Sequence, residues 1–252
     1  MTEHEAHAVH HHWEWSYYPL ILVIGIFITV PIGFALMFDY HNGSMAAMAA
    51  GIGVPLTVWG IAGWTSEGLS QKEEHGYALT SLPIFIVSEV LIFLSLFTAY
   101  WMLRLSADVW PPPGSPHIGV VMPIIMTVVL VCSSVTYHLG EGKLEEGDRG
   151  GFVTWLVVSI LLGLLFLSMT VYEYNHLIGE GFVFGTNAKS TAFYSITGFH
   201  ASHVLIGLCI FITVLIPALS GKTSRTFVTA AGVYWHFVDI IWFFVVSQIY
   251  FW

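Results

Sequence analysis

Seven stretches of the chain are apolar over about the 20 residues that a helix needs to cross the hydrocarbon core of a bilayer. A backbone in lipid must satisfy its own hydrogen bonds, so each stretch is expected to be a helix. The sequence therefore predicts an all-α integral membrane protein with seven transmembrane helices. Short connections should make successive helices antiparallel neighbours. The stretches are residues 19–38, 45–64, 79–102, 118–138, 152–172, 191–219 and 227–251.

The composition agrees with a membrane protein. Of the 252 residues, 56% are hydrophobic and only 9% are charged, whereas a soluble domain is charged at roughly a quarter of its positions. The net charge of -9 comes mostly from acids in the short connections, so it indicates no nucleic-acid partner. Cys132 and Cys209 lie in separate apolar stretches and are expected to be small core residues, not a disulfide or a zinc site.

The basic residues predict the orientation of the chain. Five of them lie in connections on the same side as the N-terminus and two lie on the opposite side, which places the N-terminus in the cytoplasm and Trp252 outside. The expected order is a His-rich tail (1–18), two helices (19–64), a cytoplasmic connection (65–78) and five helices (79–252). The five are Lys72, Lys143, Arg149, Lys222 and Arg225, and the two are Arg104 and Lys189.

Three of the apolar stretches contain prolines, at Pro31, Pro55 and Pro83. Each proline removes a backbone donor and is expected to kink or loosen its helix. The small residues of MAAMAAGIG (45–53) would let another helix or a lipid chain approach closely.

Glu89 lies near the middle of the third apolar stretch, with no basic residue within two helical turns. A lone carboxylate at that depth would be costly, so we expect it to be protonated or paired with a group on another helix or another subunit. An acid inside the membrane is a candidate functional residue by default. The alternative is a neutral, hydrogen-bonded acid that only faces a partner subunit.

Histidines and an aspartate recur at helical spacing in the last two stretches. His200 and His203 share one face of the sixth helix, and His236 and Asp239 share one face of the seventh. If the faces met, the four side chains could coordinate zinc, copper or iron. Antiparallel helices would hold the two pairs at different depths, however, and this favours a polar seam between helices or a contact with lipid headgroups.

No motif of a soluble enzyme is present: the sequence has no nucleophile elbow, no phosphate-binding loop and no HExxH. The residues alone leave an alternative function open. The chain could be a stand-alone membrane metalloprotein or ion transporter built around the four polar residues of the last two stretches. Metal analysis of the purified chain would decide it.

Several segments together resemble subunit III of the haem-copper terminal oxidases, the cytochrome c oxidase type. The resemblance is specific from about residue 79 onward and looser over the first two helices. The segments are SEVLIFLSLFTAYW (88–101), WPPPG (110–114), VTYHLGEG (135–142), VYEYNHL (171–177), TGFHASHVLIG (197–207) and YWHFVDIIWFFVVSQIYFW (234–252).

This resemblance implies a two-helix plus five-helix bundle whose two parts are separated by a lipid-filled V-shaped cleft. It also implies a non-redox subunit with no catalytic, cofactor-binding or metal-binding residue, because haem and copper belong to subunits I and II. The expected partners are subunit I as the main contact, subunit II and other oxidase subunits, phospholipids, and cytochrome c or another donor to the complex. The expected location is a prokaryotic plasma membrane. The complex would reduce oxygen to water and pump protons, and this chain would support proton uptake and the stability of subunit I.

Carried over residue by residue, Glu89 matches the family's carbodiimide-reactive membrane acid. His200 and His203 match a pair on the sixth helix, of which the second contacts lipid headgroups, and His236 and Asp239 match a polar pair on the seventh. Glu67 resembles an acid near the cleft lipid, and Lys222 or Arg225 could bind the lipid phosphate. The list of candidate lipid contacts is therefore Glu67, Lys222 and Arg225.

The chain departs from the family pattern over residues 65–82, where arginines are common and only Lys72 is basic here. Arginine suits a phosphate because its donors form a fork, so the identity of a cleft lipid is left open. The resemblance also leaves open an accessory subunit of a quinol oxidase or a nitric oxide reductase. Those relatives often have five helices, which favours the cytochrome c type.

Overall fold

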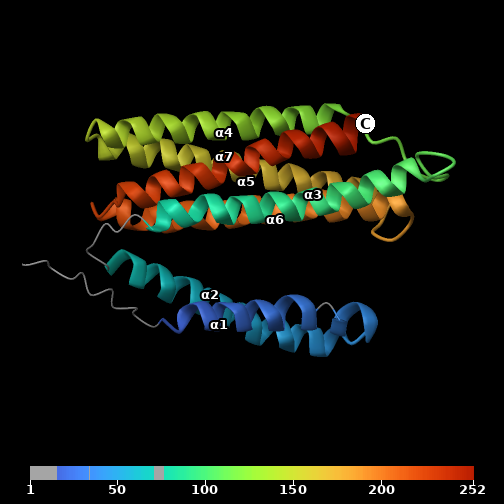
Figure 1. The fold of residues 1–252 in the computed structure, drawn as a ribbon, viewed down its shortest axis with the longest axis horizontal. Coiled ribbons are helices and arrows are strands. Elements are labelled where there is room, and N and C mark those ends of the chain that lie inside the picture. The colour runs from blue at the N-terminus through green and yellow to red at the C-terminus, as the bar shows by residue number, and fades with distance from the viewer. Residues whose placement is uncertain (1–15, 34, 71–76) are drawn as a thin grey trace, which may run out of the picture. The chain divides into compact units, whose positions relative to one another are not determined.

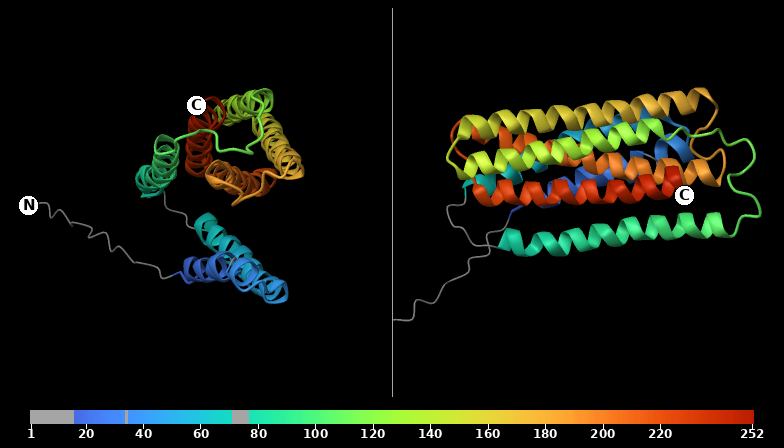
Figure 2. Two further views of the ribbon diagram at one scale, coloured as in Figure 1. Left: turned by 90° about the vertical axis from the view of Figure 1, so that its right-hand side faces the viewer. Right: turned by 90° about the horizontal axis from the view of Figure 1, so that it is seen from above.

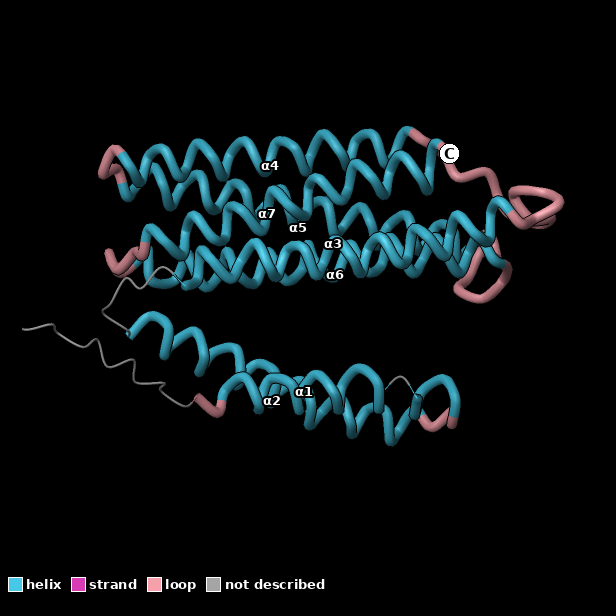
Figure 3. The backbone as a smooth tube through the Cα atoms, viewed as in Figure 1, coloured by secondary structure: helices cyan, strands magenta, loops and turns pink. Residues whose placement is uncertain are grey.

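A computed structural model of the chain describes residues 16–33, 35–70 and 77–252. Within these residues the regular structure is helical, as Figure 3 shows. Three segments are short π-helices: η1 (Ile28–Ile32), η2 (Ala35–Asp39) and η3 (Ser247–Phe251). The α-helices, labelled in Figure 1, are α1 (Tyr18–Phe27), α2 (Gly43–Ser70), α3 (Tyr77–Leu105), α4 (Val121–Glu145), α5 (Arg149–Gly179), α6 (Ala188–Leu219) and α7 (Arg225–Val246).

Six of the described helices are long and apolar enough to cross a membrane, which confirms the all-α membrane class. Large apolar side chains cover their outer surfaces; Ile84 is 72% exposed and Val121 is 68% exposed. A soluble monomer rarely leaves so much contiguous apolar surface uncovered. In a bilayer these side chains would contact lipid.

The first predicted stretch, 19–38, is not one continuous α-helix. The α-helical part ends at Phe27, and the backbone continues as η1 and η2. Pro31 lies within η1 and lacks the amide hydrogen that an α-helix would use there. In a membrane helix, local π-helical turns can satisfy the backbone groups that a proline leaves free. By contrast, α2 and α3 run on through Pro55 and Pro83.

The chain divides into two compact units, Met1–Glu74 and His75–Trp252. In the first unit, α1 and α2 pack with their backbones very close together. A Cβ atom added to Gly53 would lie 2.7 Å from the carbonyl oxygen of Gly25 and 2.2 Å from Oγ1 of Thr29. The glycine therefore permits the close approach, as the small residues of 45–53 suggested.

In the second unit, α4, α5, α6 and α7 form a ring that closes where α7 packs against α4. Helix α3 lies outside this ring and packs mainly against α6 and α7, as the end-on view in Figure 2 shows. The ring closes around Trp235, which is fully buried and donates from Nε1 to Oγ of Ser133 over 3.0 Å. Gly163 on α5 and Gly207 on α6 make room for its indole.

Two short connections within the second unit turn at glycines. Gly147 and Gly221 have φ angles of +83° and +74°, a region that glycine enters without strain. The side chains of Asp148, Asn187 and Ser224 cap the helices that follow.

Several sequence expectations need correction or lie outside the described residues. Cys132 and Cys209 are free thiols, but both are exposed on the apolar surface and not in the core. In the predicted connection 65–78, residues 65–70 still belong to α2, and residues 71–76 lie outside the described residues. So does most of the His-rich tail.

Candidate functional site

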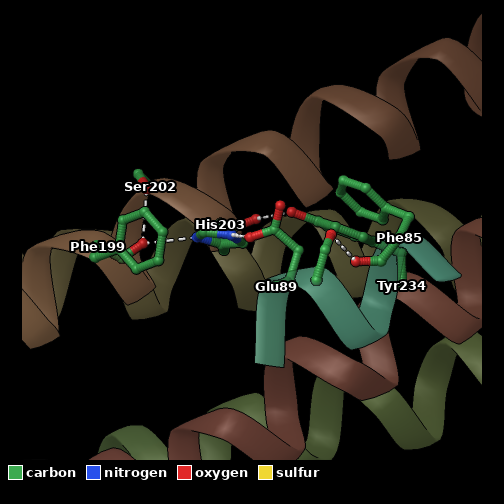
Figure 4. A network of polar contacts seen from close by, with 7 residues as sticks. Phe85, Glu89, Phe199, Ser202, His203 and Tyr234 are labelled. Atoms are coloured by element: carbon green, nitrogen blue, oxygen red, sulfur yellow. Dashed lines mark hydrogen bonds and ion pairs between the residues drawn. The ribbon is translucent and has the colours of Figure 1, made fainter. Parts of the chain in front are cut away.

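Glu89 on α3 and His203 on α6 form a polar pair between two transmembrane helices (Figure 4). Oε2 of Glu89 lies 2.9 Å from Nε2 of His203. Both side chains are largely buried, with exposed fractions of 15% for Glu89 and 7% for His203. The pair joins α3, the helix outside the ring, to a helix of the ring.

The other nitrogen of His203 fixes how the ring is protonated. Nδ1 lies 2.8 Å from the carbonyl oxygen of Phe199, one turn earlier on α6. A carbonyl oxygen only accepts, so Nδ1 carries a hydrogen and donates it. Nε2 then either accepts a hydrogen from a neutral Glu89 or, in a charged imidazolium, donates one to the Glu89 carboxylate. In both arrangements the pair is hydrogen-bonded and has no net charge.

Aromatic rings surround the pair. The ring centroids of Phe93 and Phe199 lie 5.2 Å and 4.6 Å from that of His203, and the hydroxyl of Tyr234 donates to the carbonyl oxygen of His203 over 3.3 Å. The nearby hydroxyl of Ser202 donates to a carbonyl of its own helix instead (Figure 4). The Glu89–His203 bond is therefore a local polar contact in apolar surroundings, where an unpaired group would be costly.

A second polar contact joins α4 to α7. The hydroxyl of Ser134 donates to Oδ2 of Asp239 and lies 3.1 Å from Nδ1 of His236. Asp239 is buried, and its Oδ1 has no hydrogen-bond partner among the described residues. The sequence predicted a polar seam at His236 and Asp239, but it did not identify Ser134, because a single serine in an apolar helix is a weak signal.

His200 lies apart from both contacts. It is fully buried, with its ring centroid 4.9 Å from that of Trp242 and 5.8 Å from that of Phe166. Neither ring nitrogen has a hydrogen-bond partner in the structure. Its role is packing among aromatic rings of the core, even though it shares a helix face with His203.

The four polar residues of the last two stretches thus lie in three different places. His203 contacts Glu89, His236 and Asp239 contact Ser134, and His200 contacts aromatic rings. Across the part of the chain that the structure describes, no three side chains of His, Cys, Asp or Glu gather in a way that could hold a metal ion. The coordination set suggested by the helical spacing is not formed, because the side chains point to different neighbours.

Residues 7–252 match the family model described as cytochrome c oxidase subunit III. The chain belongs to this family. Relatives named cytochrome c oxidase subunit 3 include one from Synechocystis, 32% identical over 226 residues that cover 85% of this chain and 96% of the relative, and one from Thermostichus vulcanus, 34% identical over 74% of this chain and 93% of the relative. A relative from Nocardia farcinica named probable cytochrome c oxidase subunit 3 is 37% identical over 67% of this chain and 84% of its own length.

Membership in the subunit III family confirms the resemblance read from the sequence. It makes the chain a subunit of a haem-copper oxidase, which is an oxidoreductase complex, and therefore part of an assembly with other oxidase subunits. The six apolar helices agree with a multi-pass protein of a bacterial plasma membrane.

The three candidate lipid contacts of this subunit III chain lie in different units. Glu67 is half-buried near the end of α2, in the first unit. Lys222 and Arg225 are exposed at the connection between α6 and α7, in the second unit. Their joint role at one lipid therefore stays a proposal.

Proposed function

We propose that this chain is the non-redox subunit III of a respiratory oxidase of the cytochrome c type, a complex that reduces oxygen to water and pumps protons. In this role it packs mainly against subunit I, sustains proton uptake and prolongs the active life of the oxygen-reducing site. Haem and copper are held by the partner subunits, and cytochrome c or another donor supplies the electrons.

One observation from the structure supports a role in stabilising the complex. Titratable groups deep in the membrane are used to join helices: Glu89 bonds to His203 between α3 and α6, and Ser134 bonds to Asp239 between α4 and α7. Such contacts hold helices in position and give each buried acid at least one hydrogen bond. A rigid bundle of this kind suits a subunit that positions a neighbour.

The proposal includes seven membrane crossings, with α1, η1 and η2 together forming the first, and a cytoplasmic N-terminus. It also includes a phospholipid held in a cleft between the first two helices and the remaining five. Glu67 would contact this lipid from α2, and Lys222 or Arg225 would bind its phosphate from the connection between α6 and α7. The division of the chain at Glu74 and His75 supports the two-plus-five grouping of helices.

The test is to remove this chain from the purified oxidase and compare the remaining complex with the intact one. The expected result is unchanged haem spectra, nearly unchanged initial turnover and a shorter active lifetime. Adding the purified chain back should restore the lifetime. An unchanged lifetime in the depleted complex would reject the protective role, and an immediate loss of haem absorbance would show that the chain holds the redox centres in place.

A further inference from the structure

A cavity of about 300 Å³ lies where the beginning of α4 meets the end of α5. Its walls come from residues 117–125 on one side and 172–180 on the other. This is the size at which small-ligand sites begin. Neither Glu89 nor the candidate lipid contacts Glu67, Lys222 and Arg225 line it, so it is separate from the sites described above.

Glu173 is the buried polar group of this cavity. Its exposed fraction is 7%, and it lines the cavity wall. The hydroxyl of Tyr250 donates to Oε2 of Glu173 over 2.7 Å, but Oε1 accepts no hydrogen bond from the residues that the structure describes. A buried carboxylate is stable when both oxygens accept from donors, so the free oxygen calls for a donor inside the cavity.

The charges around the cavity select a cation. Among the described residues, two carboxyl groups line it, those of Glu173 and Glu180, and no lysine or arginine does. The remaining titratable lining residues are His117, Tyr172 and His176, and Nε2 of His176 lies 3.4 Å from Oε1 of Glu180. Since Glu180 is partly exposed beside that histidine at the rim, the buried Glu173 is the group that a cation inside the cavity would pair with.

The position of the cavity selects an amphiphile. Helix α5 has 31 residues and is therefore about 46 Å long, against a hydrocarbon core of about 30 Å. If the helix is centred, about 8 Å extends beyond the core at each end. Glu173 precedes the last residue of α5, Gly179, by six positions, or about 9 Å, which places it at the boundary between the hydrocarbon core and the lipid headgroups.

The other walls fit a lipid too. Val121, Ile125 and Tyr172 line the cavity and are 68%, 47% and 63% exposed. The cavity is therefore bordered by apolar surface on which an acyl chain could lie, and an aromatic ring at headgroup level suits an interfacial position. A cationic group attached to an acyl chain satisfies both the acid and the apolar surface.

From this geometry we infer that the cavity between α4 and α5 binds the ammonium headgroup of phosphatidylethanolamine. The primary ammonium donates to the free Oε1 of Glu173. The adjoining phosphate faces the rim, where His117 can donate. The acyl chains lie against Val121 and Ile125. The carboxylate and Tyr250 stay as they are, and no covalent step is involved.

The experiment uses the intact oxidase in phosphatidylcholine nanodiscs that contain a trace of phosphatidylethanolamine with a photoreactive acyl chain. After illumination, mass spectrometry of peptides from residues 117–125 and 172–180 gives the labelling at this cavity. We expect labelling at this cavity. An excess of unlabelled phosphatidylethanolamine should remove the labelling, whereas added phosphatidylglycerol or free ethanolamine should not. Glu173→Gln should lower it roughly tenfold, because a charge-assisted hydrogen bond is lost. The matched control is Glu145→Gln, an exposed acid at the other end of α4, which should leave labelling unchanged.

A further variant separates binding from folding. Glu173→Asp keeps the negative charge and should retain more of the labelling than Glu173→Gln. Equal loss in both variants would overturn the inference, because it would point to a change in structure. Full labelling in Glu173→Gln would also overturn it, and so would competition by phosphatidylglycerol as strong as that by phosphatidylethanolamine. Displacement of the lipid by free ethanolamine would overturn it as well, because it would assign the cavity to a soluble amine.

Discussion

The Glu89–His203 pair allows a prediction whose size follows from the structure. With 15% and 7% of their side chains exposed, the two groups have almost no access to water. Glu89→Leu leaves Nε2 of His203 without a partner among aromatic rings, which should cost about 1–3 kcal/mol of unfolding free energy. In Glu89→Gln the amide donates to Nε2, so the loss should stay below about 1 kcal/mol.

The double variant tests whether the cost comes from the pair itself. Replacing both partners with apolar groups of similar shape is often nearly neutral, so Glu89→Leu combined with His203→Leu should be more stable than Glu89→Leu alone. The coupling energy in the double-mutant cycle should be about 1–3 kcal/mol. The assay is equilibrium unfolding of the purified chain in mixed micelles of a mild and a denaturing detergent.

The control for this cycle is Glu145→Leu, which removes an exposed acid of α4 and should change stability by less than about 0.5 kcal/mol. If Glu89→Leu were as stable as the native chain, or if the coupling energy were indistinguishable from zero, the pair would not fasten α3 to α6. The reasoning from burial and hydrogen bonding would then be refuted.

Three further predictions concern the packing around Trp235, the contact between α4 and α7, and the role of Glu89 in proton pumping. Gly207→Ala places a Cβ 2.6 Å from a fully buried indole and should lower the free energy of unfolding by about 1–3 kcal/mol in the same assay. The control is Gly198→Ala, whose Cβ meets its nearest atom at 3.5 Å and which should be neutral or slightly stabilising. Asp239→Asn keeps an acceptor for the hydroxyl of Ser134, so it should unfold at a higher denaturant concentration than Asp239→Leu; the reverse order would exclude that hydrogen bond. Glu89→Gln should assemble and pump protons with an unchanged proton-to-electron ratio, and loss of pumping with assembly intact would show that this acid must titrate.

The sequence was a good guide to which segments span the membrane. The predicted fourth, fifth and sixth stretches begin within about three residues of α4, α5 and α6, because apolar length is the physical requirement for crossing. The interruption of the first stretch near Pro31 was foreseen as a kink, but its extent was not, since a proline fixes where a donor is lost and not how the backbone compensates.

Partners across the bundle could not be predicted in the same way. Glu89 was expected to need a partner, yet the partner lies 114 residues away. Helices that are apolar on nearly all sides do not reveal how they are rotated. For the same reason His200 and His203 share a helix face but meet different neighbours, and Ser134 and Tyr250 became visible only as partners of Asp239 and Glu173.

The place of α3 outside the ring affects how the protein is made. It leaves the ribosome before α6 and α7, but it packs against both of them. His203 is synthesised 114 residues after Glu89, which takes roughly 6–23 s at a synthesis rate of about 5–20 residues per second. During that interval the acid resides in the membrane without its native partner, which favours its neutral form or a transient partner in the insertion machinery. A helix made before α6 and α7 therefore reaches its final position only after them.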